Sequence, residues 1–510
     1  MAGAMSETSR AVRKVTIVGG GTAGWMAAAL LSRLFAGGGF DIRLIESDEI
    51  GTIGVGEATI PAIQTFNRML GIDEDAFVAA TGGTFKLGIQ FENWRAIGDR
   101  YFHPFGQFGH DIDGLAFHQL FLKLAGQRRC ADLWHYAPCA VAAAAGRFAR
   151  IAEGEAPFPL PYAFHFDAGR YARFLRDYAE ARGVERIEGR IADVAQHADT
   201  GFVQAVRLAD GRHVDGELFV DCSGFRGLLI EGALASGYDD WSHWLPCDRA
   251  VAVPTARDRA PVPYTRAIAQ GAGWQWRIPL QHRTGNGHVY ASDYISDDDA
   301  AATLLANLDA APLADPRPVR FVPGRRLRAW DKNVVAIGLS SGFLEPLEST
   351  SIHLIQTALL RLVALFPGEG VKPADVAEYN RQTAFEMTDI RDFIIAHYKV
   401  TEREDTPFWA YVKHMAIPDS LAERLELFRT SARFFLHSRA ELFREESWVQ
   451  VLIGQGLAMR HDPMVDLIPD ADALAYLRDI EAVIDDVSAR MPDHAAFVAR
   501  NCSAAATPAR

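Results

Sequence analysis

Two uninterrupted apolar stretches near the N-terminus enclose a polar, glycine-rich turn. The first runs from Val15 to Val18 and suits a buried strand of a parallel sheet. An Ala- and Leu-rich stretch with helical character follows the turn, and then comes the second apolar stretch, "FDIRLIESD". The pattern predicts a strand, a turn, a helix and a second strand, in that order.

Later parts of the chain alternate between short strand patterns and helical ones. Several short strands are predicted around a hairpin turn at Asp210-Gly211, and they end on the apolar strand Leu218 to Val220. In "RAIAQGAGWQWRIPLQHRTGNGHVYASDY" we expect a strand pair that turns at "TGNG". From about Pro373 onward, a period near 3.6 residues predicts helices. Strand patterns near positions 15, 220 and 335 belong to one nucleotide-binding fold, so the domains are expected to interleave.

Composition narrows the class of protein. With 510 residues, the chain is long enough for two or more structural units. A net charge of -13 argues against nucleic acid as a partner, because such binding needs clustered Lys and Arg. The five cysteines are widely spaced and form neither a disulfide framework nor a zinc pattern, so we expect a reducing cytoplasm and no metal site. No apolar run reaches the roughly 18 residues of a membrane span, and no signal-peptide core is present.

The glycine-rich turn carries the spacing of a dinucleotide-binding motif. Gly19 would permit the tight turn, Gly21 would let the backbone approach a pyrophosphate, and Gly24 would let helix and strand pack closely. The second strand ends on Glu46, about 20 residues further on, which would accept hydrogen bonds from a ribose. A structural glycine-rich turn is the alternative, and the motif alone does not separate FAD from NAD.

Two charged residues are candidates for catalysis. In "FKLGIQFENW", alternation puts Phe85 and Leu87 on one face and Lys86 on the other, where a solvated strand lysine is the simplest reading. The functional alternative is an ammonium group that points into a cavity as a donor or nucleophile. Glu348 precedes an apolar helix and could belong to an ordinary helix start, or could place a carboxylate beside a ligand near free N–H groups.

Aromatic residues form a second group of candidates. Trp274 and Trp276 in "WQWRIP" lie one residue apart, so along a strand both indoles project from the same face, as core residues or as a cavity wall. His103 and Phe105 could form a turn around Pro104 or line an aromatic pocket. The same choice applies to Trp448.

Together these segments resemble the flavin-dependent halogenases of the tryptophan-halogenase family. Gly19 to Trp25 matches the family's FAD fingerprint, and "GVGEATIP" matches its second flavin-side loop. Trp274-x-Trp276-x-Ile278-Pro279 matches the WxWxIP signature. "EPLEST" matches the segment with the catalytic glutamate, here Glu348, and Lys86 matches the catalytic lysine. The likeness covers roughly Val15 to Gly456.

The resemblance implies a fold and a set of binding residues. The fold is α/β, with an FAD-binding, Rossmann-like domain of the flavin monooxygenase type over 11–370, interleaved with substrate-side segments at about 81–165 and 240–330. A mainly helical region over 371–500 completes the substrate site. The implied flavin-binding residues are Gly19, Gly21, Thr22, Ala23, Gly24, Glu46, Gly56, Glu57, Ala58, Gly338 and Leu339.

The resemblance also implies a reaction in two separate compartments. A partner flavin reductase supplies FADH2, which reacts with O2 and with chloride or bromide to give hypohalous acid. The halide rests on the backbone N–H groups of Thr350 and Ser351. The oxidant travels through a tunnel to Lys86, which holds it by hydrogen bonding or as a haloamine, and Glu348 polarises it or accepts the ring proton. Trp274 and Trp276 line the tunnel side, while His103, Phe105 and Trp448 suit the stacking of an electron-rich ring. A homodimer in the cytoplasm fits this scheme.

Three departures from the family pattern bear on the substrate and the reaction. Tryptophan-specific members usually have Gly where this chain has Ser351. Gly338-Leu339 replaces the Gly-Asp of many flavin hydroxylases, which argues against that class. The segments that hold the amino and carboxylate groups of free tryptophan have no counterpart that we can align, which weakens tryptophan itself as the substrate. A flavin monooxygenase that hydroxylates an arene, and a non-catalytic flavin-binding redox protein, are the alternatives to an indole-type halogenase.

Overall fold

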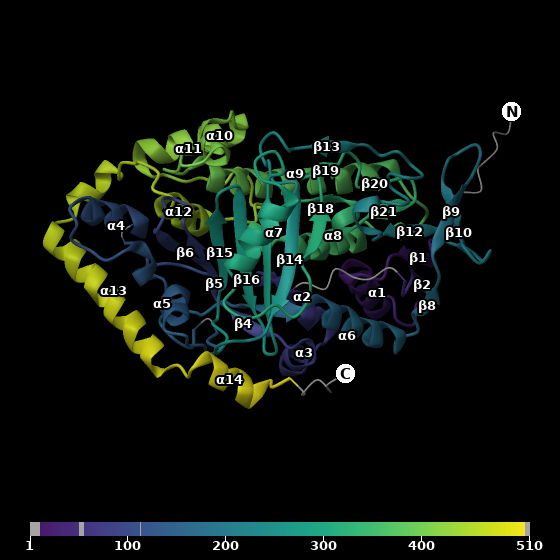
Figure 1. Cartoon of the computed structure of the whole chain (residues 1–510), viewed down its shortest axis with the longest axis horizontal. Coiled ribbons are helices and arrows are strands. Elements are labelled where there is room, and N and C mark those ends of the chain that lie inside the picture. The colour runs from purple at the N-terminus through teal and green to yellow at the C-terminus, as the bar shows by residue number, and fades with distance from the viewer. Residues whose placement is uncertain (1–10, 50–55, 113, 153, 505–510) are drawn as a thin grey trace.

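A six-stranded sheet contains the first predicted strand at its centre. The computed structural model describes residues 11–49, 56–112, 114–152 and 154–504. The order across the sheet is β20 (Trp330–Asp331), β21 (Val334–Ala336), β12 (Leu218–Asp221), β1 (Lys14–Val18), β2 (Asp41–Glu46) and β8 (Glu185–Glu188). All neighbouring pairs are parallel except β20 with β21. Strands far apart in sequence thus lie side by side, which confirms the predicted interleaved α/β fold (Figure 1).

Helices from three parts of the chain pack beside this sheet, on the right in Figure 1. Helix α1 (Thr22–Leu34) follows β1 directly and buries nine consecutive residues from Gly24 to Ser32. It contacts α6 (Ala168–Glu180) and α8 (Ser351–Ala364). A helix with so little polar surface is stable only when neighbouring elements cover it on several sides.

A second, seven-stranded sheet occupies the middle of the molecule (Figure 1). Its order is β18 (Arg317–Arg320), β14 (Arg249–Thr255), β17 (Thr284–Tyr290), β16 (Gly273–Pro279), β15 (Thr265–Gln270), β5 (Gly88–Glu92) and β6 (Arg100–Pro104). Strands β15 and β5 are parallel, and the other neighbours are antiparallel.

The predicted turn at "TGNG" is wrong. These four residues begin β17 and pair with β16 and β14, while the turn lies just before them at Leu280 to Arg283, where Leu280 N–H donates to the Arg283 carbonyl at 2.9 Å. Glycine is needed within the strand for space, since a Cβ atom at Gly287 would lie 2.1 Å from the Trp276 indole. Packing against that indole, and not turn geometry, explains this glycine.

Three small sheets complete the strand structure. The sheet of β3 (Gly56–Ala58), β7 (Ala163–Asp167) and β4 (Thr84–Lys86) is antiparallel. In the sheet of β9 (Ile191–Gln196), β10 (Val203–Leu208) and β11 (His213–Asp215), the predicted hairpin at Asp210-Gly211 is confirmed by the antiparallel pairing of β10 with β11. The third sheet contains β13 (Tyr238–Asp240), β19 (Gly324–Arg326) and β22 (Gly342–Phe343).

The remaining helices lie mostly in the C-terminal third of the chain. They are α9 (Pro373–Lys399), α10 (Pro407–His414), α11 (Asp419–Ser431), α12 (Glu445–Gly454), α13 (Asp470–Arg490) and α14 (His494–Asn501). Earlier helices are α2 (Ala62–Leu70), α3 (Glu74–Thr81), α4 (Phe117–Gly126), α5 (Pro138–Ala144) and α7 (Asp297–Ala306). Among the described residues, no helix combines the length and apolar character needed to cross a membrane. The residue boundaries of the predicted domains stay a prediction.

Candidate active site

The glycine-rich turn leaves no room for side chains between β1 and α1. Gly19 has a φ of +110°, and a Cβ atom there would lie 2.2 Å from the Cys222 carbonyl oxygen. A Cβ atom on Gly24 would lie 1.8 Å from the Gly19 carbonyl oxygen. Helix α1 begins after Gly21, and no side chain caps its first N–H groups. These N–H groups are therefore available to an anionic ligand such as a phosphate.

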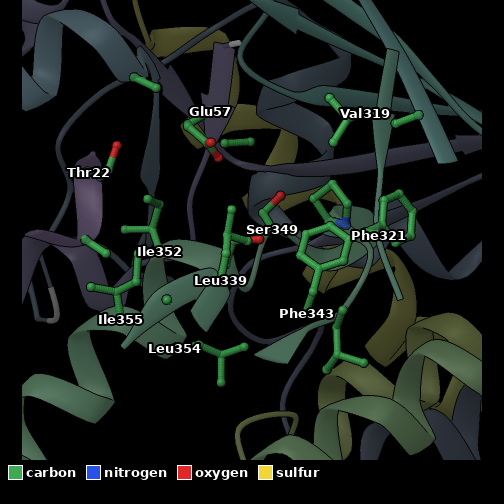
Figure 2. Close-up of a pocket in the computed structure, with 18 of the residues that line it drawn as sticks. Thr22, Glu57, Val319, Phe321, Leu339, Phe343, Ser349, Ile352, Leu354 and Ile355 are labelled. Carbon is green, nitrogen blue, oxygen red and sulfur yellow. The ribbon is translucent and has the colours of Figure 1, made fainter. Parts of the chain in front are cut away.

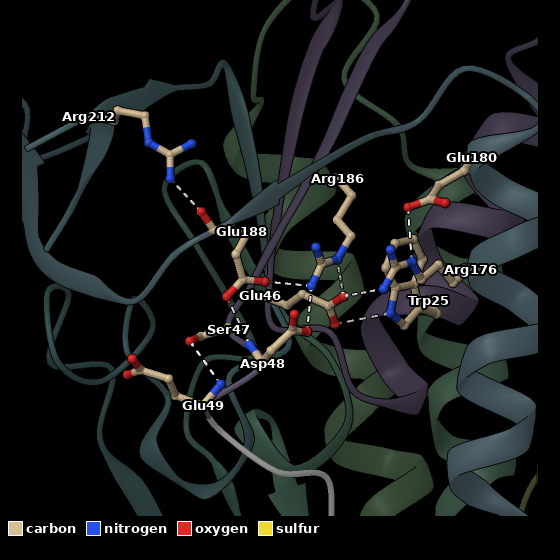
Figure 3. Close-up of polar contacts among 10 residues, drawn as sticks. All are labelled: Trp25, Glu46, Ser47, Asp48, Glu49, Arg176, Glu180, Arg186, Glu188 and Arg212. Atoms are coloured by element: carbon tan, nitrogen blue, oxygen red, sulfur yellow. Dashed lines mark hydrogen bonds and ion pairs between the residues drawn. The ribbon is translucent and has the colours of Figure 1, made fainter. Parts of the chain in front are cut away.

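Glu46, at the end of β2, lies against this turn and is held by three neighbours (Figure 3). Its Oε1 accepts a hydrogen bond from Arg186 Nε at 2.5 Å and lies 3.6 Å from Arg176, while Oε2 accepts from Trp25 Nε1 at 3.3 Å. A Cβ atom on Gly20 would lie only 1.5 Å from Oε2. The carboxylate is thus fixed above the turn, and its binding to a ribose stays a prediction.

One cavity of about 300 Å³ adjoins the turn and contains most of the predicted flavin-side residues. Figure 2 shows Thr22 and Glu57 on one side of the view, Phe321 and Phe343 on the other, and Ser349 between them. The predicted residues that line the cavity are Gly21, Thr22, Ala23, Gly56, Glu57, Ala58, Gly338, Leu339, Trp274, Trp276, Ile278 and Ser351. Gly54 and Val55 of the "GVGEATIP" segment lie outside the described residues.

Glu57 is the acidic residue of this lining. Its half-buried side chain has no hydrogen bond or ion pair with another residue of the described ranges, and burial raises its pKa to about 7. Gly338 lies opposite the start of α1 with a φ of +74°, and a Cβ atom there would lie 2.9 Å from the Cβ of Ala23. The Glu57 carboxyl group is readily protonated, and Gly338 lets its backbone approach Ala23 closely. Both features suit a large, mainly apolar cofactor.

The start of α8 faces the same cavity. Its N-cap residue is Thr350, whose side chain does not cap the helix and whose buried Oγ1 has no partner within the described residues. Ser351 is the first helical residue and lines the cavity. The uncapped N–H groups could hold a small anion, so the structure is compatible with the predicted halide position without testing it.

Lys86 is fully buried, and the reading of a solvated strand lysine is therefore wrong. Its Nζ donates hydrogen bonds to the Thr59 carbonyl at 3.0 Å and to Ser349 Oγ at 2.8 Å, and it lies 5.2 Å from the centre of the Phe105 ring. Burial lowers the pKa of Lys86 to about 7, an effect that the negative charge of Glu348 partly offsets. The side chain can therefore serve as an ammonium donor or as an amine near neutral pH.

Glu348 is held between two imidazole rings. His103 Nδ1 lies 2.9 Å from Oε2, and His397 Nε2 lies 2.8 Å from Oε1. Burial alone would raise the pKa of Glu348, but the two histidines outweigh it and lower the pKa to about 2. Glu348 is consequently an ionised carboxylate in a site that excludes water. His103 thus contacts the candidate base directly, and its stacking on a substrate stays a prediction.

Trp274 and Trp276 belong to the hydrophobic core and also form part of the cavity wall. Their ring centroids lie 6.2 Å apart, and both side chains are buried and line the cavity. Trp274 Nε1 donates to Glu345 Oε2 at 2.6 Å, and the same oxygen accepts from the Tyr398 hydroxyl at 2.6 Å. Pro279, the last residue of the motif, does not line the cavity; its carbonyl accepts a hydrogen bond from Thr84 at 2.7 Å.

Trp448 belongs to an aromatic cluster near Glu348. Its ring lies 4.8 Å from Phe393, which in turn lies 5.0 Å from the His397 ring. The Phe434 ring stacks on Trp448 with 6.0 Å between the ring centroids, and the Arg424 guanidinium lies 4.6 Å from the centre of the Trp448 ring. The predicted role of Trp448 in substrate stacking remains a prediction.

Sequence reasoning missed three residues that hold the two candidate catalytic groups, namely Thr59, Ser349 and His397. Ser349 is the most informative, because it contacts Lys86, follows Glu348 and lines the cavity. It adopts a left-handed backbone conformation with a φ of +60°, which is uncommon for a residue other than glycine and frequent at functional sites. Its position next to Glu348 was the only signal in the sequence.

Comparisons with known proteins show the family of the chain. The family model described as Tryptophan halogenase matches residues 14–470. A relative from Kutzneria sp. (strain 744), the 7-chloro-L-tryptophan 6-halogenase KtzR, is 40% identical over 82% of this chain and 85% of its own length. Two solved structures are also similar. Xcc4156, a flavin-dependent halogenase from Xanthomonas campestris, has a TM-score of 0.95 and 52% identity over 98% of this chain and all of its own. BrvH, a flavin-dependent halogenase from Brevundimonas sp. BAL3, has a TM-score of 0.91 and 47% identity over 96% of this chain and 99% of its own.

Proposed function

The chain belongs to the tryptophan halogenase family of flavin-dependent enzymes, and from that premise we propose that it uses FADH2, O2 and chloride or bromide to halogenate a freely diffusing, electron-rich arene of the indole type. A separate flavin reductase would supply the reduced cofactor. The observation that carries the proposal is the contact between Lys86 and Ser349. Ser349 lines the cavity and follows Glu348 directly, so the contact joins the buried lysine to the cavity and to the candidate base.

The cavity residues fit a flavin dinucleotide. The glycine-only turn and the uncapped start of α1 suit the pyrophosphate, and the mainly apolar lining suits a fused ring system. Gly21, Thr22, Ala23, Glu57 and Gly338 would hold the cofactor. When bound, the reduced flavin would supply two electrons that bring O2 to the peroxide level, and oxygen at that level would oxidise a halide to hypohalous acid.

The residues of the chain then divide the remaining work. Trp274 and Trp276 form the wall on one side of the cavity and keep the arene away from the cofactor. Ser349 marks the place where the cavity meets Lys86. The Lys86 ammonium group has three N–H donors, and its bonds to Thr59 and Ser349 use two of them. The third position on Nζ would bind hypohalous acid or capture the halogen.

Glu348 is suited to remove the ring proton. During transfer, the bond between oxygen and halogen breaks, a bond between ring carbon and halogen forms, and the leaving hydroxide takes a proton from the Lys86 ammonium group to become water. The arenium carbon then loses its proton to the ionised Glu348 carboxylate, as to a positioned general base. His103 and His397 fix the carboxylate and stabilise its charge before the reaction begins.

Product analysis tests the proposal. The protein is incubated with FAD, a flavin reductase, NADH, chloride or bromide, and a panel of indoles and phenols, and the products are analysed by mass spectrometry. Incorporation of halogen into an indole-type arene supports the proposal. Products that carry only an added oxygen atom would instead establish the hydroxylase alternative, and flavin turnover without any arene product would favour a redox protein.

A further inference from the structure

Lys86 lies on a short strand that is paired along only one edge. Strand β4 has three residues, Thr84 to Lys86, and its one partner in the sheet is β7. In antiparallel pairing, alternate residues turn their N–H groups away from the partner strand, and here the N–H of Phe85 faces away from β7. The backbone that carries the candidate catalytic lysine thus has an open edge next to the lysine itself.

A histidine from the far end of the chain occupies this edge. His494, the first residue of α14, is buried, and its Nε2 accepts a hydrogen bond from Phe85 N–H at 3.2 Å. Its Nδ1 lies 2.7 Å from the Pro261 carbonyl oxygen. Because a carbonyl oxygen only accepts, Nδ1 must carry the proton, and Nε2 is left with the lone pair that Phe85 needs. The two contacts fix one neutral tautomer.

The residue after Lys86 is tied to the same segment. Leu87 N–H donates to the Pro263 carbonyl at 2.8 Å, and Pro263 lies two residues after Pro261, whose carbonyl accepts the hydrogen bond from His494 Nδ1. The backbone on either side of Lys86 is therefore bonded to Pro261–Pro263, directly at Leu87 and through the imidazole at Phe85. Burial lowers the pKa of His494 to about 4, so the ring stays neutral and keeps this bonding over the physiological range.

We propose that His494 is a positioning residue for Lys86. It holds the Phe85 peptide so that the Lys86 side chain reaches Thr59 and Ser349 together, as the two Nζ hydrogen bonds require. An error of about 1 Å in the position of a reacting group can cost a hundredfold in rate. The C-terminal helix α14 thereby acts on a site more than 400 residues earlier in the chain (|i−j| of 409 for the Phe85–His494 bond). The proposal rests on the function proposed for Lys86.

Two substitutions separate hydrogen bonding from packing. His494→Gln can donate to Pro261 and accept from Phe85 through its amide, but it loses the ring that contacts Phe85 and Phe148. His494→Phe keeps an aromatic ring and loses both hydrogen bonds. Asp493→Ala is the matched control, because it removes the side-chain cap of α14 and leaves His494 in place.

The kinetic test compares these variants in the coupled assay with a reductase, halide and an indole. We expect His494→Phe to lower kcat for arene halogenation about tenfold or more, with flavin affinity, arene KM and the release of hypohalous acid to a chemical trap unchanged. His494→Gln and Asp493→Ala should stay within about threefold of the unmodified protein. The proposal is overturned if His494→Phe keeps the full kcat, if His494→Gln falls equally far, or if flavin affinity falls in step with kcat.

Amide hydrogen exchange gives a readout that does not depend on turnover. In a peptide that spans residues 84–88, exchange should become about tenfold faster in His494→Phe, because an anchored N–H is released, and should not change in His494→Gln or Asp493→Ala. Unchanged exchange in His494→Phe contradicts the proposal. If the unmodified protein halogenates no arene, the proposed function fails while this test of the backbone anchor still gives an answer.

Discussion

The Nζ atom of Lys86 donates a hydrogen bond to Oγ of Ser349 across 2.8 Å, and this contact joins two parts of the chain that are 263 positions apart. Ser349 follows Glu348 directly and lines the cavity that we assign to the flavin. The lysine, the glutamate and the cavity thus meet at one residue. Under the proposed function, an oxidant formed in the cavity would meet Lys86 beside this residue.

Removal of the Lys86 amine should separate the two halves of the reaction. In Lys86→Ala, arene halogenation should fall about a hundredfold or more, because no other cation lies among the described residues that contact Lys86 Nζ. Flavin oxidation and halide-dependent formation of hypohalous acid should continue, since Lys86 does not line the cavity. Both rates are measured in one assay, and a parallel loss of flavin oxidation would contradict the assignment of two compartments.

The pH dependence should reveal which form of Lys86 reacts. Because burial lowers its pKa to about 7, the free amine becomes the main species above that pH and the ammonium below it. Capture as a haloamine needs the amine lone pair, so the halogenation rate would rise through pH 7. Binding by an ammonium donor would make the rate fall through the same pH. We expect an inflection near pH 7 in single-turnover halogenation with added hypohalous acid, and a flat profile between pH 6 and 8 would show that Lys86 does not change its protonation state in the rate-limiting step.

Glu348→Gln should slow halogen transfer about a hundredfold while leaving Lys86 in place. The amide cannot accept a proton from the arenium carbon, and it loses the charge that both imidazoles face. A kinetic isotope effect at the halogenated ring position should appear in this variant, because proton removal would become rate-limiting. An unchanged rate of product formation would remove Glu348 from the mechanism.

The two tryptophans of the wall should differ in their effect on stability. Trp274→Phe leaves the buried Glu345 with one donor fewer, which should lower the free energy of unfolding by about 1–3 kcal/mol. Trp276→Phe is the matched control, since within the described residues its indole N–H has no hydrogen-bond partner in the protein. Urea unfolding followed by circular dichroism measures both changes. An equal decrease in the free energy of unfolding in the two variants would show that the hydrogen bond from Trp274 to Glu345 does not stabilise the fold.

Local sequence patterns were sufficient for the nucleotide-binding half of the fold. The turn from Gly19 to Gly24 is determined by steric contacts within about 30 residues of chain, together with the Cys222 carbonyl, so its spacing can be recognised directly. Asp210-Gly211 was equally informative, because a short hairpin turn depends on its own backbone angles, here with Gly211 at a φ of +91°. Apart from the Cys222 carbonyl, both features are defined by residues that are close in the chain.

Long-range contacts were not accessible in the same way. Lys86 looked like a surface lysine because alternation describes one strand, whereas its burial comes from Thr59 and Ser349 in other segments. The glycines of "TGNG" suggested a turn, but Gly287 is glycine because an indole from the next strand lies over it. His397 and His494 gave no local signal, since His397 acts on Glu348, which lies outside its own helix, and His494 acts on Phe85, more than 400 residues earlier. For Lys86 and Glu348, only the resemblance to a family identified the candidates.

Gly287 and Trp276 also limit how the cavity can be redesigned. The indole covers the space that a side chain at residue 287 would need, so a larger residue fits at 287 only if the residue at 276 is smaller. A mutant library that replaces Trp276 with smaller residues would expose the backbone at Gly287 and leave a void beside it. Libraries should therefore randomise the two codons jointly, and pairs with a smaller residue at 276 and a side chain at 287 should be recovered more often than either change alone.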